Sequence, residues 1–134
     1  MEQEQKENQR SIRIGAERVL KLAVEYEKLG YLVVSNPATH SGVDLMIISA
    51  PDGKIRKVIE VTNYKNGQWQ MDSQRFDRYI ASLIYFDTID GIEKELVVTS
   101  LDNLTASQLV ELKKSGIHVT VRPIQDLPSE EDNQ

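Results

Sequence analysis

The turn segment Ala50-Pro-Asp-Gly-Lys54 constrains the fold of this chain more than any other feature. It separates two apolar segments, Asp44–Ile48 and Ile55–Val61, which have the composition of strands. Proline suits the first central position of a type I turn, aspartate tolerates the second, and glycine suits the left-handed position that follows. We therefore expect a hairpin with a three-residue loop and a bulge, in which Ala50 opposes Lys54.

This loop length predicts the pairing of the two strands. Counting back from the turn, Met46 opposes Val58 and Asp44 opposes Glu60, on the same side of the sheet. A two-residue loop would shift the register by one and send the two carboxylates to opposite faces. The position of both acids therefore depends on one turn.

The rest of the chain alternates helical and strand patterns. We expect a helix over Ser11–Leu29 with an apolar stripe that includes Ala16, Val19, Leu20, Ala23, Tyr26 and Leu29. The later elements are expected at Tyr31–Val34 (strand), Asp72–Phe86 (helix), Glu95–Thr99 (strand), Thr105–Gly116 (helix with a Thr105/Gln108 capping box) and Ile117–Arg122 (edge strand). The order αβββαβαβ, with apolar residues on both faces of the hairpin, predicts an α/β fold: a mixed sheet of about five strands with helices on both faces.

Composition limits the class of protein. With 134 residues, 40% of them apolar and 28% charged, the chain suits one domain with its own core, and the absence of Cys excludes thiolate chemistry. We expect a flexible N-terminal tail over residues 1–10, a domain over residues 11–124 and an acidic tail over residues 125–134. The net charge of −5 lies entirely in the two tails, so the domain itself is neutral. No apolar run is long enough to span a membrane and no signal peptide is evident, which favours the cytoplasm.

Two carboxylates side by side in an apolar sheet need compensation, because like charges repel and burial penalises each of them. A Mg²⁺ ion would provide it, since this hard cation prefers oxygen ligands and commonly binds one or two carboxylates. Glu17, at the margin of the apolar stripe of the first helix, is a third acid that could lean over the sheet. Asp44, Glu60 and Glu17 are thus the candidate site.

At these residues the chain resembles the PD-(D/E)xK nuclease superfamily, and within it the archaeal Holliday-junction resolvases and Mrr-like endonucleases. The resemblance rests on Gly15-Ala-Glu17, Gly42-Val-Asp44 and Ile59-Glu-Val-Thr62, and the order of elements agrees with it. It implies that Asp44, Glu60 and the main-chain carbonyl of Val61 bind Mg²⁺ or Mn²⁺, with Glu17 binding directly or through water. It also implies a metal-dependent DNA endonuclease that acts on branched or duplex DNA, with the metal generating hydroxide and stabilising charge on the phosphate.

The chain departs from this pattern where the family has its lysine, two residues after the second acid, since Thr62 stands there. Its hydroxyl could perform only part of the lysine's work of positioning water and offsetting phosphate charge. Lys65 and Lys21 are possible substitutes, whereas Lys57 belongs to the opposite face of its strand. The substitution leaves open an alternative, in which the protein is an inactive nuclease-fold module that binds DNA or a protein partner.

Further interpretations concern the surface. The basic segment comprises Lys54, Arg56, Lys65, Trp69, Arg75 and Arg78. Together with the loop residues His40 and Ser41 it is a candidate contact surface for DNA. A charged helix face and solvated loop side chains are the commoner interpretation of such residues. A domain of this size has little room to grip duplex DNA alone, so we expect a homodimer. The acidic tails could contact a protein partner, and Asp44 and Glu17 could also be ordinary loop and surface residues.

Overall fold

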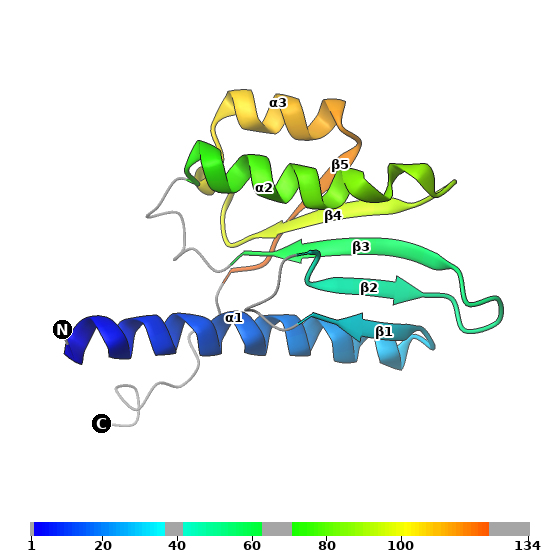
Figure 1. The fold of residues 1–134 in the computed structure, drawn as a ribbon, viewed down its shortest axis with the longest axis horizontal. Coiled ribbons are helices and arrows are strands. Elements are labelled where there is room, and N and C mark those ends of the chain that lie inside the picture. The colour runs from blue at the N-terminus through cyan, green and yellow to red at the C-terminus, as the bar shows by residue number, and fades with distance from the viewer. Residues whose placement is uncertain (1, 37–41, 63–70, 124–134) are drawn as a thin grey trace.

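The computed structural model describes residues 2–36, with side chains from residue 15, and residues 42–62 and 71–123. Five strands form one mixed sheet in the order β1-β2-β3-β4-β5, in which the first three are antiparallel and the last two run parallel to β3 (Figure 1). The elements are α1 (Glu2–Lys28), β1 (Leu32–Ser35), β2 (Leu45–Ile48), β3 (Ile55–Val61), α2 (Ser73–Ile84), β4 (Glu93–Val98), α3 (Ala106–Lys114) and β5 (Ile117–Val121), with short 3-10 turns at Tyr85–Thr88 and Leu101–Asn103. The expected order of elements is confirmed.

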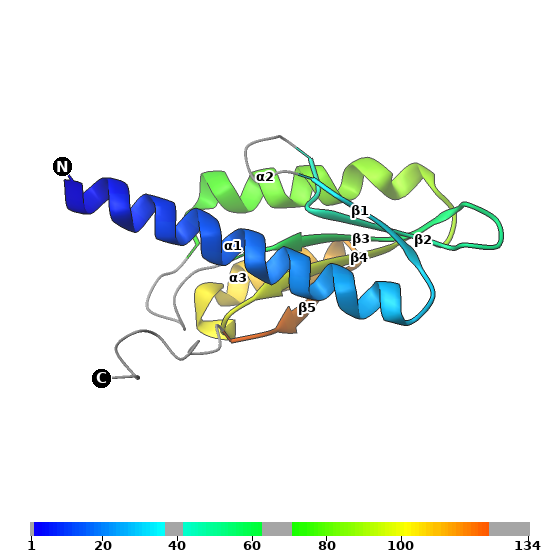
Figure 2. The ribbon, with the colours of Figure 1, turned by 90° about the horizontal axis from the view of Figure 1, so that it is seen from below.

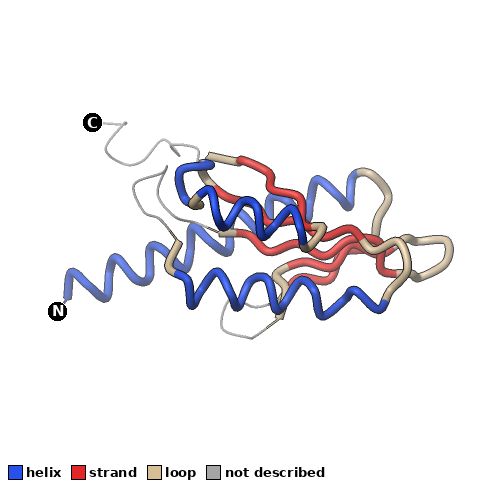
Figure 3. Tube along the Cα trace, turned by 90° about the horizontal axis from the view of Figure 1, so that it is seen from above, coloured by secondary structure: helices blue, strands red, loops and turns tan. Residues whose placement is uncertain are grey.

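Helices cover both faces of the sheet. Figure 2 shows α1 crossing one face, and Figure 3 shows α2 and α3 on the other. Successive strand residues point to opposite faces, so the sheet supplies two apolar cores. The core beneath α1 contains Leu22, Ala23, Leu45, Ile47, Ile59 and Val97. The larger core beneath α2 and α3 contains, among others, Val58, Phe76, Leu83, Leu96, Val98 and Leu112.

The β2–β3 hairpin has the expected register near the acids but not at its turn. Met46 pairs with Val58, as predicted, and Leu45 pairs with Ile59. The predicted pairing of Ala50 with Lys54 is wrong: the Ser49 N–H donates to the Lys54 carbonyl at 2.9 Å, which makes the loop one residue longer.

An irregularity in β3 compensates for the longer loop. Ile48 pairs with Ile55 whereas Ile47 pairs with Lys57, so Arg56 is an extra residue that shifts the register back. Gly53 takes the expected left-handed conformation, with φ of 69°. Two deviations of one residue therefore cancel before the strands reach Asp44 and Glu60.

Helix α1 differs most from expectation. It begins at Glu2 rather than Ser11, because the polar Glu, Gln, Lys and Arg residues before Ser11 are good helix formers without apolar periodicity. Leu20 and Leu29, which the sequence places in the buried stripe, are 64% and 73% exposed. No helix in the described parts of the chain is both long and apolar enough to cross a membrane.

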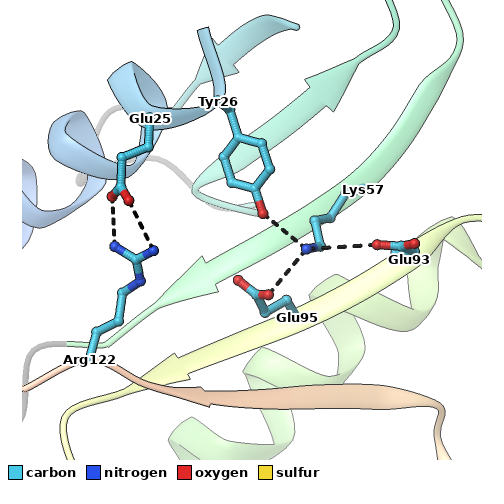
Figure 4. A network of polar contacts seen from close by, with 6 residues as sticks. All are labelled: Glu25, Tyr26, Lys57, Glu93, Glu95 and Arg122. Atoms are coloured by element: carbon cyan, nitrogen blue, oxygen red, sulfur yellow. Dashed lines mark hydrogen bonds and ion pairs between the residues drawn. The ribbon is translucent and has the colours of Figure 1, made fainter. Parts of the chain in front are cut away.

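A hydrogen bond and an ion pair attach α1 to β3 and to the end of β5 (Figure 4). Lys57 of β3 donates to the Tyr26 hydroxyl at 2.9 Å and lies 3.2 Å from Glu95 of β4. Near the end of β5, Arg122 forms two hydrogen bonds with Glu25 of α1. Lys57 is therefore occupied on the α1 face, as its place in the strand predicted.

We expect Lys57→Met to lower the free energy of unfolding by about 1–3 kcal/mol, because it leaves the buried Glu95 without its cation. Urea denaturation at neutral pH measures this change. Lys113→Met, at an exposed position of α3, is the control and should change stability by less than about 0.5 kcal/mol. Equal effects of the two substitutions would contradict a structural role for the Lys57 contacts.

Candidate active site

Asp44 and Glu60, which we call the carboxylate pair, lie where β2 begins and β3 ends. The Asp44 N–H donates to Glu60 Oε1 at 2.9 Å, and the Val61 N–H donates to Asp44 Oδ2 at 2.7 Å. Each side chain thus accepts a main-chain hydrogen bond from the neighbouring strand. The two carboxyl groups are close enough that the charge of Asp44 acts on Glu60. The pairing of these acids, expected from the register, is present.

Burial makes this pair costly to ionise. Glu60 is 4% exposed. Loss of water and the adjacent Asp44 charge raise the pKa of Glu60 to about 8, against the opposing effect of the Asp44 N–H. Burial also raises the pKa of Asp44, and the hydrogen bond from Val61 offsets part of that rise. Near neutral pH the pair therefore keeps about one proton between its two carboxyl groups.

Oxygen atoms remain to bind a cation. The two main-chain hydrogen bonds occupy Glu60 Oε1 and Asp44 Oδ2. Within the described part of the chain, the other carboxylate oxygens, Oε2 and Oδ1, have no recorded protein donor. Hard oxygen donors of this kind suit Mg²⁺ and Mn²⁺. The residues present therefore fit a divalent metal ion.

Thr62, two residues after Glu60, has a buried side chain that bonds to β4. Its Oγ1 donates to the Val97 carbonyl at 2.8 Å, and its N–H donates to the same carbonyl at 2.9 Å. Its hydroxyl proton is therefore used inside the sheet. This bond ties the end of β3 to β4 immediately beside Glu60.

Glu17 does not join the carboxylate pair. Its side chain is exposed on α1. In the described ranges, no three His, Asp or Glu side chains form a group that could hold a metal ion. Glu17 nevertheless lies one residue before Arg18, whose Nε donates to the Thr62 carbonyl at 3.1 Å. The start of the buried part of α1 is thus anchored at the end of β3.

Arg18 is a feature that sequence reasoning missed. Its guanidinium is partly buried, and burial together with the nearby Arg122 lowers its pKa. Its Nη2 is buried and has no hydrogen-bond partner among the described residues. The sequence signal that could have indicated this position was spacing. Arg18 lies four residues before Leu22, on the same face of the helix, and Leu22 is buried against the sheet.

The predicted basic segment does not form one surface. Lys54 belongs to the β2–β3 turn and Arg56 to the start of β3, at the end of the sheet opposite the beginning of α2 (Figure 1). Arg56 also pairs with Asp52 at 2.6 Å. Arg75 and Arg78 lie in the first half of α2, at the same end as the carboxylate pair. Lys65, Trp69, His40 and Ser41 lie outside the described residues.

Comparisons with known proteins support the fold. No family model and no curated protein matches the chain. A solved structure, the crystal structure of a repair endonuclease from Pyrococcus abyssi, superposes with a TM-score of 0.50 at 20% sequence identity. The chain is similar in fold to a repair endonuclease. The match covers 78% of this chain but 45% of that protein, so the chain spans less than half of its length.

The raised pKa of Glu60 predicts how stability depends on pH. The folded state holds a proton that the unfolded state loses above its ordinary pKa of 4.5, so stability falls as pH rises from about 4.5 to about 8 and is flat above. The slope should approach about 1.4 kcal/mol per pH unit. Urea denaturation without divalent metal, from about pH 5 to pH 8, measures it.

Glu60→Gln should remove most of this slope, because the amide does not titrate. Glu111→Gln, at an exposed position of α3, should leave the slope unchanged. The same pH dependence in wild type and Glu60→Gln would mean that Glu60 is not the group that holds the proton.

Proposed function

We propose that this protein is a metal-dependent DNA endonuclease acting in the cytoplasm. The observation that carries the proposal is the buried carboxylate pair, in which burial raises the pKa of both acids and the charge of Asp44 raises that of Glu60 further, without a compensating cation among the described residues. The fold shared with a repair endonuclease supports it. The resemblance of Asp44, Glu60 and Thr62 to the PD-(D/E)xK pattern supplies the class of reaction.

Asp44, Glu60 and the carbonyl of Val61 would hold Mg²⁺ or Mn²⁺. When bound, the metal would supply a nucleophilic hydroxide and stabilise the charge that develops on the phosphate. Asp44 and Glu60 would release their shared proton on binding it, and their main-chain hydrogen bonds would keep both carboxylates oriented. Glu17 would take part only through a water molecule, because it does not join Asp44 and Glu60 in one group of ligands in the described ranges.

In this proposal another cationic side chain takes over the role of the lysine that the PD-(D/E)xK pattern has at the position of Thr62. Lys65 and Lys21 remain candidates by sequence, and Arg18 joins them because its guanidinium bonds the main chain of Thr62. Arg75 and Arg78 would contact the DNA backbone at the same end of the domain. A homodimer would present two sites to the two strands of duplex or branched DNA.

A second candidate function is an inactive nuclease-fold module that binds DNA, or a protein partner through its acidic tails. The bond from the Thr62 hydroxyl to Val97 favours it, because this residue is committed to the sheet and cannot at the same time donate that proton to a phosphate. Such a module has no need of a metal ion. Metal affinity therefore separates the two functions.

Titration calorimetry with Mn²⁺ tests the metal site. Wild type should bind with release of a proton near neutral pH, and Asp44→Asn should weaken binding at least about tenfold while the protein remains folded. Asp90→Asn, at an exposed position before β4, is the control and should bind like wild type. Absent Mn²⁺ binding in wild type would contradict the endonuclease proposal and favour the inactive module.

Cleavage assays with supercoiled, linear and branched DNA in Mg²⁺ or Mn²⁺ test the reaction itself. Wild type should cut at least one substrate, and Glu60→Gln should reduce the rate at least about 100-fold, because it removes a charged ligand. Failure to cut any of these substrates, at any protein concentration, would contradict the proposed reaction.

A further inference from the structure

Strand β1 is an outer strand of the described sheet, and its four residues are uncharged, which is unusual for an outer strand. It pairs with β2 on one side, and its sequence, Leu32-Val-Val-Ser35, contains neither charge nor proline. Outer strands of native sheets are commonly protected by lysine, proline or a covering segment, because their unpaired N–H and C=O groups attract another strand. An unprotected outer strand of this kind is suited to pairing.

Apolar side chains flank β1 on both faces of the sheet. Leu32 and Val34 are 55% and 45% exposed on the α2 side, where their partners Ile48 and Met46 point. On the other face, α1 exposes Leu20 and Val24, one helical turn apart.

The flank of α1 that carries Leu20 and Val24 faces away from β5. Arg18 and Glu25 of the same helix contact the end of β3 and Arg122, and Leu20 and Val24 lie about 100° or more round the helix from both. They are therefore on the β1 side, and Figures 1 and 2 show β1 beside the second half of α1. We call the whole area the β1 surface; it comprises Leu20, Val24, Leu29, Tyr31, Leu32 and Val34.

We propose that the β1 surface binds the β1 surface of a second copy of this chain, with the two β1 strands pairing antiparallel about a twofold axis. An antiparallel strand pair is self-complementary, so one edge can serve both copies. None of the six side chains of the β1 surface is charged, so a basic partner would find no carboxylate among them, whereas a second copy presents the same apolar residues. The occupant is therefore a like copy rather than a basic partner.

The area agrees with a dimer. The six side chains together expose the equivalent of about three whole residues, or roughly 600 Å² on each copy at about 200 Å² a residue. Two copies would bury roughly 1,200 Å², which is at the lower limit of stable specific interfaces before backbone pairing is added. Six of the eleven large apolar residues exposed in the described ranges belong to this surface.

The pairing has a consequence that rests on the proposed function. The Asn36 N–H, directly after β1, donates to the Asp44 carbonyl at 2.9 Å, so the β1 surface adjoins the carboxylate pair. A β1–β1 contact would build one continuous sheet that carries two such pairs. The dimer contact itself does not require that the protein cuts DNA.

Sedimentation velocity of the full chain, without DNA or metal, tests the contact. The apparent mass of the wild type should be twice the 15.2 kDa mass of one chain. Val34→Lys and Leu20→Lys should each raise the dissociation constant at least about tenfold, since each buries a charge at the contact. Val110→Lys is the matched control: this residue of α3 is 53% exposed, outside the β1 surface, and its substitution should leave the dimer intact.

Leu20→Lys also separates loss of the dimer from misfolding. Leu20 is exposed, so this variant should keep the circular dichroism spectrum of the wild type. A monomeric wild type at about 100 μM would overturn the proposal, as would a dimer that survives both substitutions. Since neither result depends on activity, a failed contact and a failed nuclease are distinguishable.

Discussion

The mutual burial of Asp44 and Glu60 is the constraint on which the rest of the site depends. Each carboxylate accepts an N–H from the opposite strand, so the backbone itself holds the two side chains together. Without another charge, this arrangement raises the pKa of both groups and opposes folding as pH rises. Under the proposed function, a bound divalent cation would offset this cost.

The sequence predicted the pairing of Asp44 with Glu60 better than it predicted the turn from which that pairing was derived. The Pro-Asp-Gly segment indicated a three-residue loop, whereas Ser49 pairs with Lys54 and the loop is longer. The extra residue at Arg56 restores the register, so Asp44 and Glu60 still meet. Alternating apolar residues, which must face the two cores, determined the register more strongly than turn chemistry did.

Other features depend on tertiary contacts that a single sequence does not display. Arg18 reads as a surface residue of a helix, yet its bond to the Thr62 carbonyl places it at the end of β3. Leu20 fits the apolar stripe by periodicity, but α1 packs Leu22 and Ala23 against the sheet and leaves Leu20 64% exposed. The Lys57 contacts join residues from three elements far apart in the chain. By contrast, the capping box of Thr105 and Gln108 was readable because it is entirely local.

The location of a bound metal ion tests the central claim most directly. A crystal soaked in Mn²⁺ and measured for anomalous scattering should show a peak between Asp44 and Glu60, close to the carbonyl of Val61. The same density map would identify which of Arg18, Lys21 and Lys65 approaches the ion. A well-diffracting soaked crystal with no peak at the carboxylate pair, or with both side chains bonded to a protein cation instead, would contradict the account.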